Sequence, residues 1–98
     1  MLNQFPQLVI LYDDLEVVHS VKERAEYLHS VAADDLSQVL IVNKQAQYFT
    51  LANTLSEPLS SAQLATRVTN YLLNEGHCCL SKITSLTPQQ AFALLEID

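Results

Sequence analysis

Residues 8–23 read Leu-Val-Ile-Leu-Tyr-Asp-Asp-Leu-Glu-Val-Val-His-Ser-Val-Lys-Glu, and this stretch decides the fold. Its first five residues are apolar and partly β-branched, which is typical of a strand buried on both faces. Two interpretations of the residues after this strand remain open. In the first, Asp13-Asp14 form a tight turn, residues 15–19 form a second strand, and a helix begins with the capping box Ser20-Val21-Lys22-Glu23. In the second, a longer helix begins at Asp13, because one continuous apolar arc of a helical wheel is filled by Val17, Val18, Val21, Ala25, Leu28 and Ala32.

The middle of the chain predicts a β-hairpin. Asp34-Asp35 are unfavourable in the last turn of a helix, so the first helix is expected to end before them and leave them in a loop. Residues 39–42 then form a strand, residues 43–45 supply the turn, and residues 46–51 return antiparallel. Residues 52–59 contain turn formers and are expected to be a loop.

The last third of the chain carries two helix starts and one further strand. Ser60-Ser61-Ala62-Gln63 is a capping box, and the helix that it opens is expected to stop at Gly76 in a left-handed conformation. Residues 78–83 are short and partly β-branched, which favours a strand. Thr87-Pro88-Gln89-Gln90 predicts a final helix with threonine as its cap and proline at its first position.

These elements predict a single α+β domain over residues 1–98. We expect one mixed, largely antiparallel sheet of about five strands with three helices, in the order ββαββαβα, and with the helices mainly on one face. If the longer helix from Asp13 is correct, the order becomes βαββαβα, a ferredoxin-like arrangement with a terminal helix.

Two segments resemble a short bacterial family known as a domain of unknown function. The first is Leu8-Val9-Ile10-Leu11 followed by Asp13-Asp14-Leu15-Glu16-Val17-Val18. The second is Gly76-His77-Cys78-Cys79-Leu80-Ser81-Lys82-Ile83, followed by an alanine- and leucine-rich terminal helix. In that family the segment after the acidic pair resembles a returning strand, so the resemblance favours the first interpretation of residues 13–19. It implies no activity.

Composition excludes several classes of function. The chain is 49% hydrophobic and 16% charged, and five basic against eleven acidic residues give a formal charge of −6. Such a field repels phosphate backbones, so we predict no nucleic-acid partner. No stretch approaches the ~18 to 20 apolar residues of a membrane span, and the N-terminus has no basic region, so we expect no membrane partner and a cytoplasmic protein. The single glycine rules out glycine-rich phosphate loops, and we predict no cofactor.

His77, Cys78 and Cys79 form the most distinctive chemical cluster. Imidazole and thiolate are preferred ligands of zinc, and a thiolate beside an imidazolium is a nucleophile. On a strand, however, consecutive side chains point to opposite faces. A metal site would therefore also need His19 or His29 and a carboxylate from elsewhere in the fold, and a nucleophilic thiol would need His19 or His29 as its base. The competing interpretation is two cysteines buried as small hydrophobic residues. Metal- or thiol-dependent activity at this cluster is the alternative function.

The leading hypothesis is a non-enzymatic interaction or accessory module that binds a protein partner or forms a homodimer. The low charged fraction leaves apolar surface for such a contact, and aromatic residues are enriched at interfaces. The candidate interaction residues are Tyr12, Tyr27 and Tyr48. Tyr27 falls outside the apolar arc of the first helix, so it is expected to be the most exposed of them.

Overall fold

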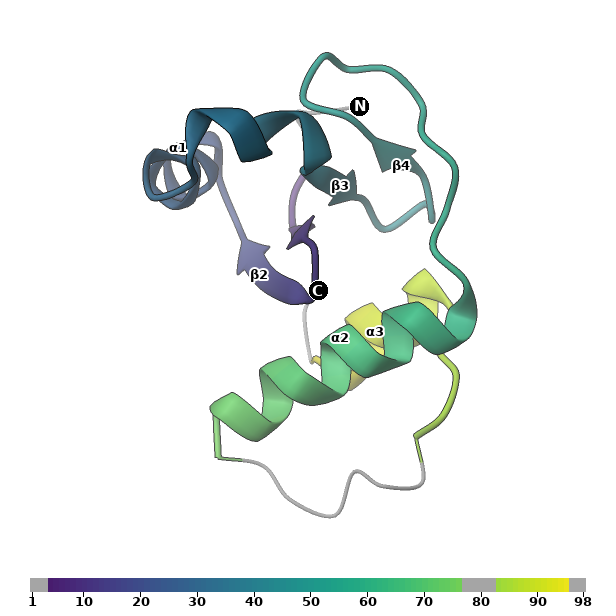
Figure 1. The fold of residues 1–98 in the computed structure, drawn as a ribbon. Helices are drawn as coiled ribbons and strands as arrows, with labels where there is room; N and C mark the ends of the chain where they lie inside the picture. Colours follow the sequence, from purple (N-terminus) through teal and green to yellow (C-terminus); the bar gives the residue numbers. More distant parts are fainter. Residues whose placement is uncertain (1–3, 77–82, 96–98) are drawn as a thin grey trace.

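The computed structural model describes residues 4–76 and 83–95 of the chain. They form an α+β fold with one antiparallel sheet and helices on both of its sides (Figure 1). The α+β class predicted from the sequence is therefore confirmed. The strands are β1 (Gln7–Leu11), β2 (Asp14–Val18), β3 (Leu40–Val42) and β4 (Tyr48–Phe49). The helices are α1 (Val21–His29), the 3-10 helix η1 (Ala33–Gln38), α2 (Ser61–Asn74) and α3 (Pro88–Leu94).

The segment after the acidic pair is a strand, as the first interpretation predicted. A two-residue turn joins β1 to β2, and each residue of β1 has a partner in β2. This pairing satisfies the backbone of β2 and buries Leu15 and Val18 on opposite faces of the sheet. The longer helix from Asp13 and the ferredoxin-like alternative are therefore wrong. The helix begins only after Ser20.

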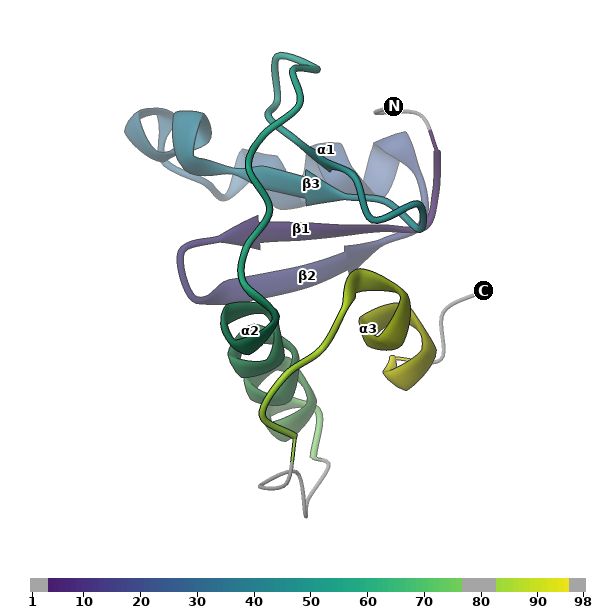
Figure 2. The same cartoon turned by 90° about the vertical axis from the view of Figure 1, so that its right-hand side faces the viewer.

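The strand order is β2-β1-β3-β4, so β1 lies inside the sheet and all five of its residues are buried. Leu8 and Ile10 belong to a core cluster with α2 and α3, whereas Val9 and Leu11 belong to a second cluster on the side of α1. Figures 1 and 2 show α1 on one face and α2 with α3 on the other. The sequence placed the helices mainly on one face: α2 and α3 share one face, and α1 covers the other. A strand that is apolar on both faces needs cover on both.

The helix ends follow the predicted capping chemistry. Ser60 with Gln63 and Thr87 with Gln90 form complete capping boxes, and Gly76 has a φ of 90° just after α2. At α1 the Ser20 hydroxyl accepts from the Glu23 N–H, as predicted. The Glu23 carboxylate, however, accepts from the N–H of the residue before the cap.

Three predicted segments differ from the structure in detail. Asp34-Asp35 lie in the first turn of η1 instead of a loop, at the helix end where the dipole favours negative charge. The return strand predicted at 46–51 shrinks to β4. Ala46 adopts a φ of 65° in the turn before it, and the Thr50 carbonyl accepts a hydrogen bond from the Asn53 N–H in the turn after it. The further strand predicted at 78–83 lies outside the described residues except for Ile83, which is not in a strand.

Helix α1 contains no fully buried residue, and a polar contact ties it to the sheet. Arg24 Nη1 donates to Gln7 Oε1 at 2.9 Å, and the Arg24 guanidinium lies 5.4 Å from the centroid of the Phe5 ring. The Gln7 side chain is completely buried, so its oxygen needs such a donor. This contact fixes α1 beside β1 and β2.

Candidate functional site

The histidine and cysteine cluster predicted from the sequence falls outside the described residues, since residues 77–82 include His77, Cys78 and Cys79. His19 is exposed at the end of β2, and its backbone N–H donates to Glu23 Oε1 at 3.1 Å. Among residues 4–76 and 83–95, no group of three histidine, cysteine, aspartate or glutamate side chains has the arrangement needed to hold a metal ion. The metal or thiol hypothesis therefore stays a prediction.

The three candidate tyrosines lie in three different environments. Tyr48 is only 3% exposed and belongs to the core beside α2. A buried ring offers no surface to a partner, so Tyr48 leaves the candidate set. Tyr27 is half-buried against the core cluster beside α1, and burial raises its pKa. The expectation that Tyr27 is the most exposed of the three is wrong, because Tyr12 is 56% exposed.

Tyr12 occupies the first position of the turn between β1 and β2 and has a φ of 54°. This left-handed conformation is uncommon for a bulky residue, and contacts on both sides hold it. Its hydroxyl donates to Asp35 Oδ1 at 2.9 Å, and this hydrogen bond raises the pKa of Tyr12. Its carbonyl accepts a hydrogen bond from Arg67 Nε at 2.7 Å. Tyr12 therefore connects η1 through its ring and α2 through its backbone.

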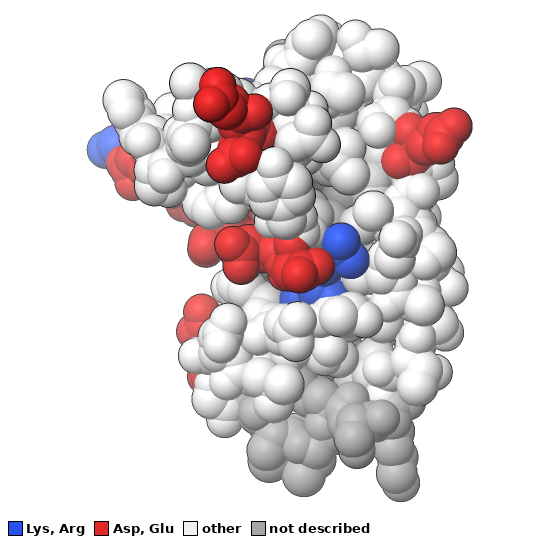
Figure 3. All heavy atoms as spheres, in the orientation of Figure 1, with Lys and Arg blue, Asp and Glu red and all other residues white. Residues whose placement is uncertain are grey.

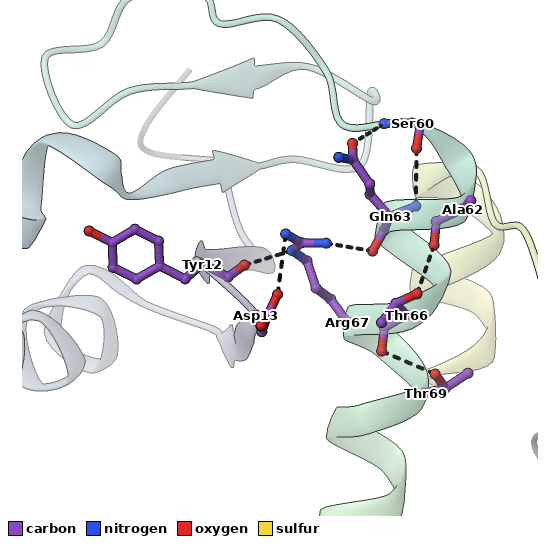
Figure 4. A network of polar contacts seen from close by, with 8 residues as sticks. All are labelled: Tyr12, Asp13, Ser60, Ala62, Gln63, Thr66, Arg67 and Thr69. Atoms are coloured by element: carbon purple, nitrogen blue, oxygen red, sulfur yellow. Dashed lines mark hydrogen bonds and ion pairs between the residues drawn. The ribbon is translucent and has the colours of Figure 1, made fainter.

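Arg67 is the residue of α2 that holds this turn (Figure 4). Its Nη1 also donates to the Gln63 carbonyl at 2.9 Å, and its Nη2 lies 3.7 Å from Asp13 Oδ1. The Asp13 side chain is 88% exposed, so water screens this ion pair and it contributes little to stability. The two hydrogen bonds to carbonyls contribute more, because they come from a charged donor. The network therefore positions the start of β2.

The outer edge of β2 lies beside two surface hollows. The first, of about 300 Å³, lies between β2 and the second half of α2. Its lining includes the apolar surfaces of Leu15, Tyr71 and Leu73, and Leu73 is 53% exposed. Asp13, Asp14, Asn70 and Asn74 complete it. This hollow is therefore lined by both apolar and polar side chains.

The second hollow, of about 360 Å³, lies between β2 and α1. It is lined by Glu16, Val17, Val18, Glu23, Glu26 and Tyr27. Every charged residue lining either hollow is acidic. Figure 3 shows acidic side chains at the indentation between the part of the molecule that carries α1 and the part that carries α2, with basic atoms directly beside them and other acidic side chains elsewhere on this face. We call the outer edge of β2 together with these two hollows the β2 edge surface.

Burial and neighbouring charge raise the pKa of Glu16, Tyr71 and Tyr27 at the β2 edge surface. Burial and then the nearby charge of Glu75 raise the pKa of Glu16. Burial raises the pKa of Tyr71, and the nearby charges of Glu75 and Glu16 raise it further. Burial also raises the pKa of Tyr27, and the charges of Asp14 and Glu16 add to this effect. In each case burial is the larger cause, and the neighbouring carboxylates add to it.

Sequence reasoning found part of this surface and missed the rest. It singled out the acidic pair and Tyr27 but assigned them no common place. Asp13 and Asp14 lie more than fifty residues before Tyr71 and Leu73 along the chain. No local sequence motif predicts that these two segments meet, because their contact depends on the packing of α2 against β2.

Fold and site together define a small α+β protein whose antiparallel sheet ends in a strand with an acidic outer edge. Within the described residues, the helices are too short or too polar to cross a membrane. The chain belongs to the DUF4144 family, described as a protein structure with unknown function, whose model matches residues 5–95. This confirms the resemblance to a domain of unknown function. Searches of curated proteins and of solved structures found no match.

Proposed function

We propose that this protein is a non-enzymatic interaction module that binds a protein partner at the β2 edge surface. The observation that carries the proposal is the apolar and aromatic surface on both sides of the outer strand β2. The exposed Leu73 and the half-buried Tyr71 lie on the side of α2, and the half-buried Tyr27 lies on the side of α1. Aromatic and apolar groups surrounded by polar ones are the usual composition of a protein interface. The formal charge of −6 argues against nucleic acid as the partner.

Hydrogen bonds from neighbouring elements also hold the β2 edge surface in place. Arg67 and Tyr12 fix the turn that begins β2, and the contact between Arg24 and Gln7 fixes α1. A surface held in this way loses little conformational entropy when a partner binds. Tyr12 acts in this proposal as a positioning residue beside the contact.

A matched pair of exposed leucines tests the proposal. Leu73 lines the first hollow and is 53% exposed, whereas Leu55 is 66% exposed beside β4 at the opposite end of the sheet. The tagged protein, Leu73→Ser and Leu55→Ser are each used to capture partners from native lysate with chemical crosslinking and quantitative mass spectrometry. We expect one protein to be recovered with the wild type and Leu55→Ser, and to fall about tenfold with Leu73→Ser.

Equal recovery with all three proteins would contradict the proposal, and so would loss with Leu55→Ser alone. Thermal unfolding of each variant shows that the fold is intact. Light scattering against concentration provides a separate outcome: a homodimer that Leu73→Ser dissociates would make the partner a second copy of this chain.

A further inference from the structure

We infer that the partner segment is an extended, cationic peptide that joins the sheet as an additional strand beside β2. Its side chains alternate, with lysine or arginine on the side of α1 and apolar residues on the side of α2. This inference rests on the proposed function and specifies the chemistry of the partner.

The register of the hairpin shows which backbone groups face outward. A two-residue loop joins Leu11 to Asp14, so the pairs that exchange hydrogen bonds with β1 involve Asp14, Glu16 and Val18. The N–H and C=O groups of Leu15 and Val17 therefore point away from β1. No other strand of the described residues pairs with β2, which is the last strand in the order. These groups are the hydrogen-bonding partners that strand addition uses.

The side chains of β2 specify what the added strand carries. Leu15 and Val17 pack with the core on the α2 side, next to the exposed Leu73. Asp14 and Glu16 alternate with them along β2. Glu16 lines the hollow beside α1 together with Tyr27, and Asp14, at the turn end of the strand, borders the hollow beside α2. Neighbouring strands place side chains of the same face side by side. An added strand therefore meets carboxylates with every second residue and apolar groups with the others.

A second copy of this chain is a poor occupant of the same edge. Two β2 strands paired antiparallel about their centres would place Glu16 directly opposite Glu16, and like charges opposite each other destabilise a strand pair. Each copy also carries a formal charge of −6. A cationic segment has the opposite sign, relieves the crowding of Glu16 with Glu75, and is drawn in by the field of the whole protein.

The test uses a capped seven-residue peptide of alternating lysine and valine, titrated into the ¹⁵N-labelled protein. We expect the amide signals of Leu15 and Val17 to shift and their hydrogen exchange to slow, while that of Ser56 beside β4 stays unchanged. A peptide of the same composition with its lysines and valines in two blocks is expected to bind about tenfold more weakly. Affinity of the alternating peptide falls as salt rises, because exposed charges contribute to it.

Charge reversal gives the matched protein control. Glu16→Lys is expected to weaken the lysine-valine peptide about tenfold and to allow an alternating glutamate-valine peptide to bind. Glu57→Lys makes the same change of charge in the exposed loop after β4 and is expected to leave the affinity within about twofold. Equal weakening by both variants would show attraction by net charge alone and would overturn the inference.

Methylated peptides test the backbone contact without altering the protein. In one peptide the valine amides carry N-methyl groups, and in the other the lysine amides do. Antiparallel addition beside Leu15 and Val17 directs the valine amides toward β2, so the first peptide loses binding and the second keeps it. Parallel addition gives the reverse. If both peptides bind like the unmodified one, or if neither binds, strand addition is wrong.

The inference and the proposed function fail separately. If a partner is captured in a Leu73-dependent way but the alternating peptide does not bind, the proposed interaction module is supported and the inference of a cationic added strand is wrong. Peptide binding mapped to Leu15 and Val17 without any captured partner supports the chemistry of the edge and contradicts the proposed biological role.

Discussion

The two outer edges of the sheet are finished in different ways. Outside β4 the chain covers its own edge, because the Ser56 N–H donates to the Tyr48 carbonyl at 2.8 Å and Leu55 forms a bridge with Phe49. Outside β2 the described residues place no strand, and the exposed side chains of Asp14 and Glu16 mark the edge instead. Natural sheets protect their edges by covering them or by charging them. This protein does both, one at each end.

The difference matters because the two devices exclude different things. A covered edge offers fewer backbone groups to an added strand, whatever the charge of that strand. A charged edge excludes a strand of the same sign, including a second copy of the chain, but keeps its N–H and C=O groups available. In the inference above the β2 edge is selective and the β4 edge is covered, and variants at either end of the sheet can test this contrast.

The largest expected effect comes from opening the covered edge. Ser56→Pro removes the N–H that pairs with the carbonyl of the buried Tyr48, and we expect the free energy of unfolding to fall by about 2 kcal/mol in urea titrations. Ser56→Ala keeps the N–H and is expected to change stability by less than about 0.5 kcal/mol. If Ser56→Pro were as stable as Ser56→Ala, the β4 edge would not depend on this bond.

The next effect concerns the support of the open edge. Arg67→Ala removes two charge-assisted hydrogen bonds to the Tyr12 and Gln63 carbonyls, and we expect a loss of about 1 to 2 kcal/mol in the free energy of unfolding. Faster hydrogen exchange in β2 should accompany it, with no change at Ser56. Asp13→Asn removes only the screened ion pair and is expected to cost less than about 0.5 kcal/mol. Equal costs for the two variants would make the ion pair the important contact.

Tyr12→Phe is expected to lower the free energy of unfolding by less than Arg67→Ala does, because it removes one exposed hydrogen bond to Asp35. That bond raises the pKa of Tyr12 in the folded protein. Its contribution is therefore present below the tyrosine pKa of the unfolded chain and is lost as the pH rises through the folded value. Urea titrations at pH 7 and at pH 11 check this, since the difference between the two proteins should shrink at the higher pH. A constant difference would mean that the hydroxyl has another role.

The sequence predicted the local parts of this architecture and missed the parts made by packing. Capping at Ser60 and Thr87 and the stop at Gly76 depend on residues within one turn, so short patterns suffice to predict them. The hairpin of β1 and β2 required a choice between two periodicities. That choice was decided by the neighbouring strand, which a helical wheel does not contain.

The candidate site was less predictable because it is assembled from distant segments. Arg67 reaches the Tyr12 carbonyl across 55 positions of sequence. Tyr48 looked like an interaction residue, yet α2 and α3 cover the face on which it lies. Tyr27 was expected to be exposed because it lies outside the apolar arc of its helix, but it packs against the core cluster beside α1 and is half-buried. In each case the deciding neighbour comes from another element.

The smallest effect is the most specific to the open edge. Glu16 faces Asp14 on its own strand, Glu23, Glu26 and Tyr27 of α1, and Tyr71 and Glu75 at the end of α2. Burial and the charge of Glu75 raise its folded pKa. The ionised side chain therefore costs stability at neutral pH. Replacing it by glutamine should stabilise the free protein at pH 7, by less than about 0.5 kcal/mol, since the site is partly solvated.

The direction of this effect with pH separates crowded charge from a simple change of side chain. A carboxyl whose pKa is raised by folding contributes stability below its unfolded pKa, and that contribution disappears as the pH rises through the folded value. The advantage of Glu16→Gln should therefore be present at pH 7 and absent near pH 3, where both proteins are neutral at this position. Glu57→Gln, in the loop after β4, provides the matched change of charge. A bound lysine-valine peptide should reverse the sign at pH 7, because the carboxylate then has a cationic partner that glutamine lacks. An advantage that persists at pH 3, or that survives peptide binding, would contradict an open edge held ready for positive charge.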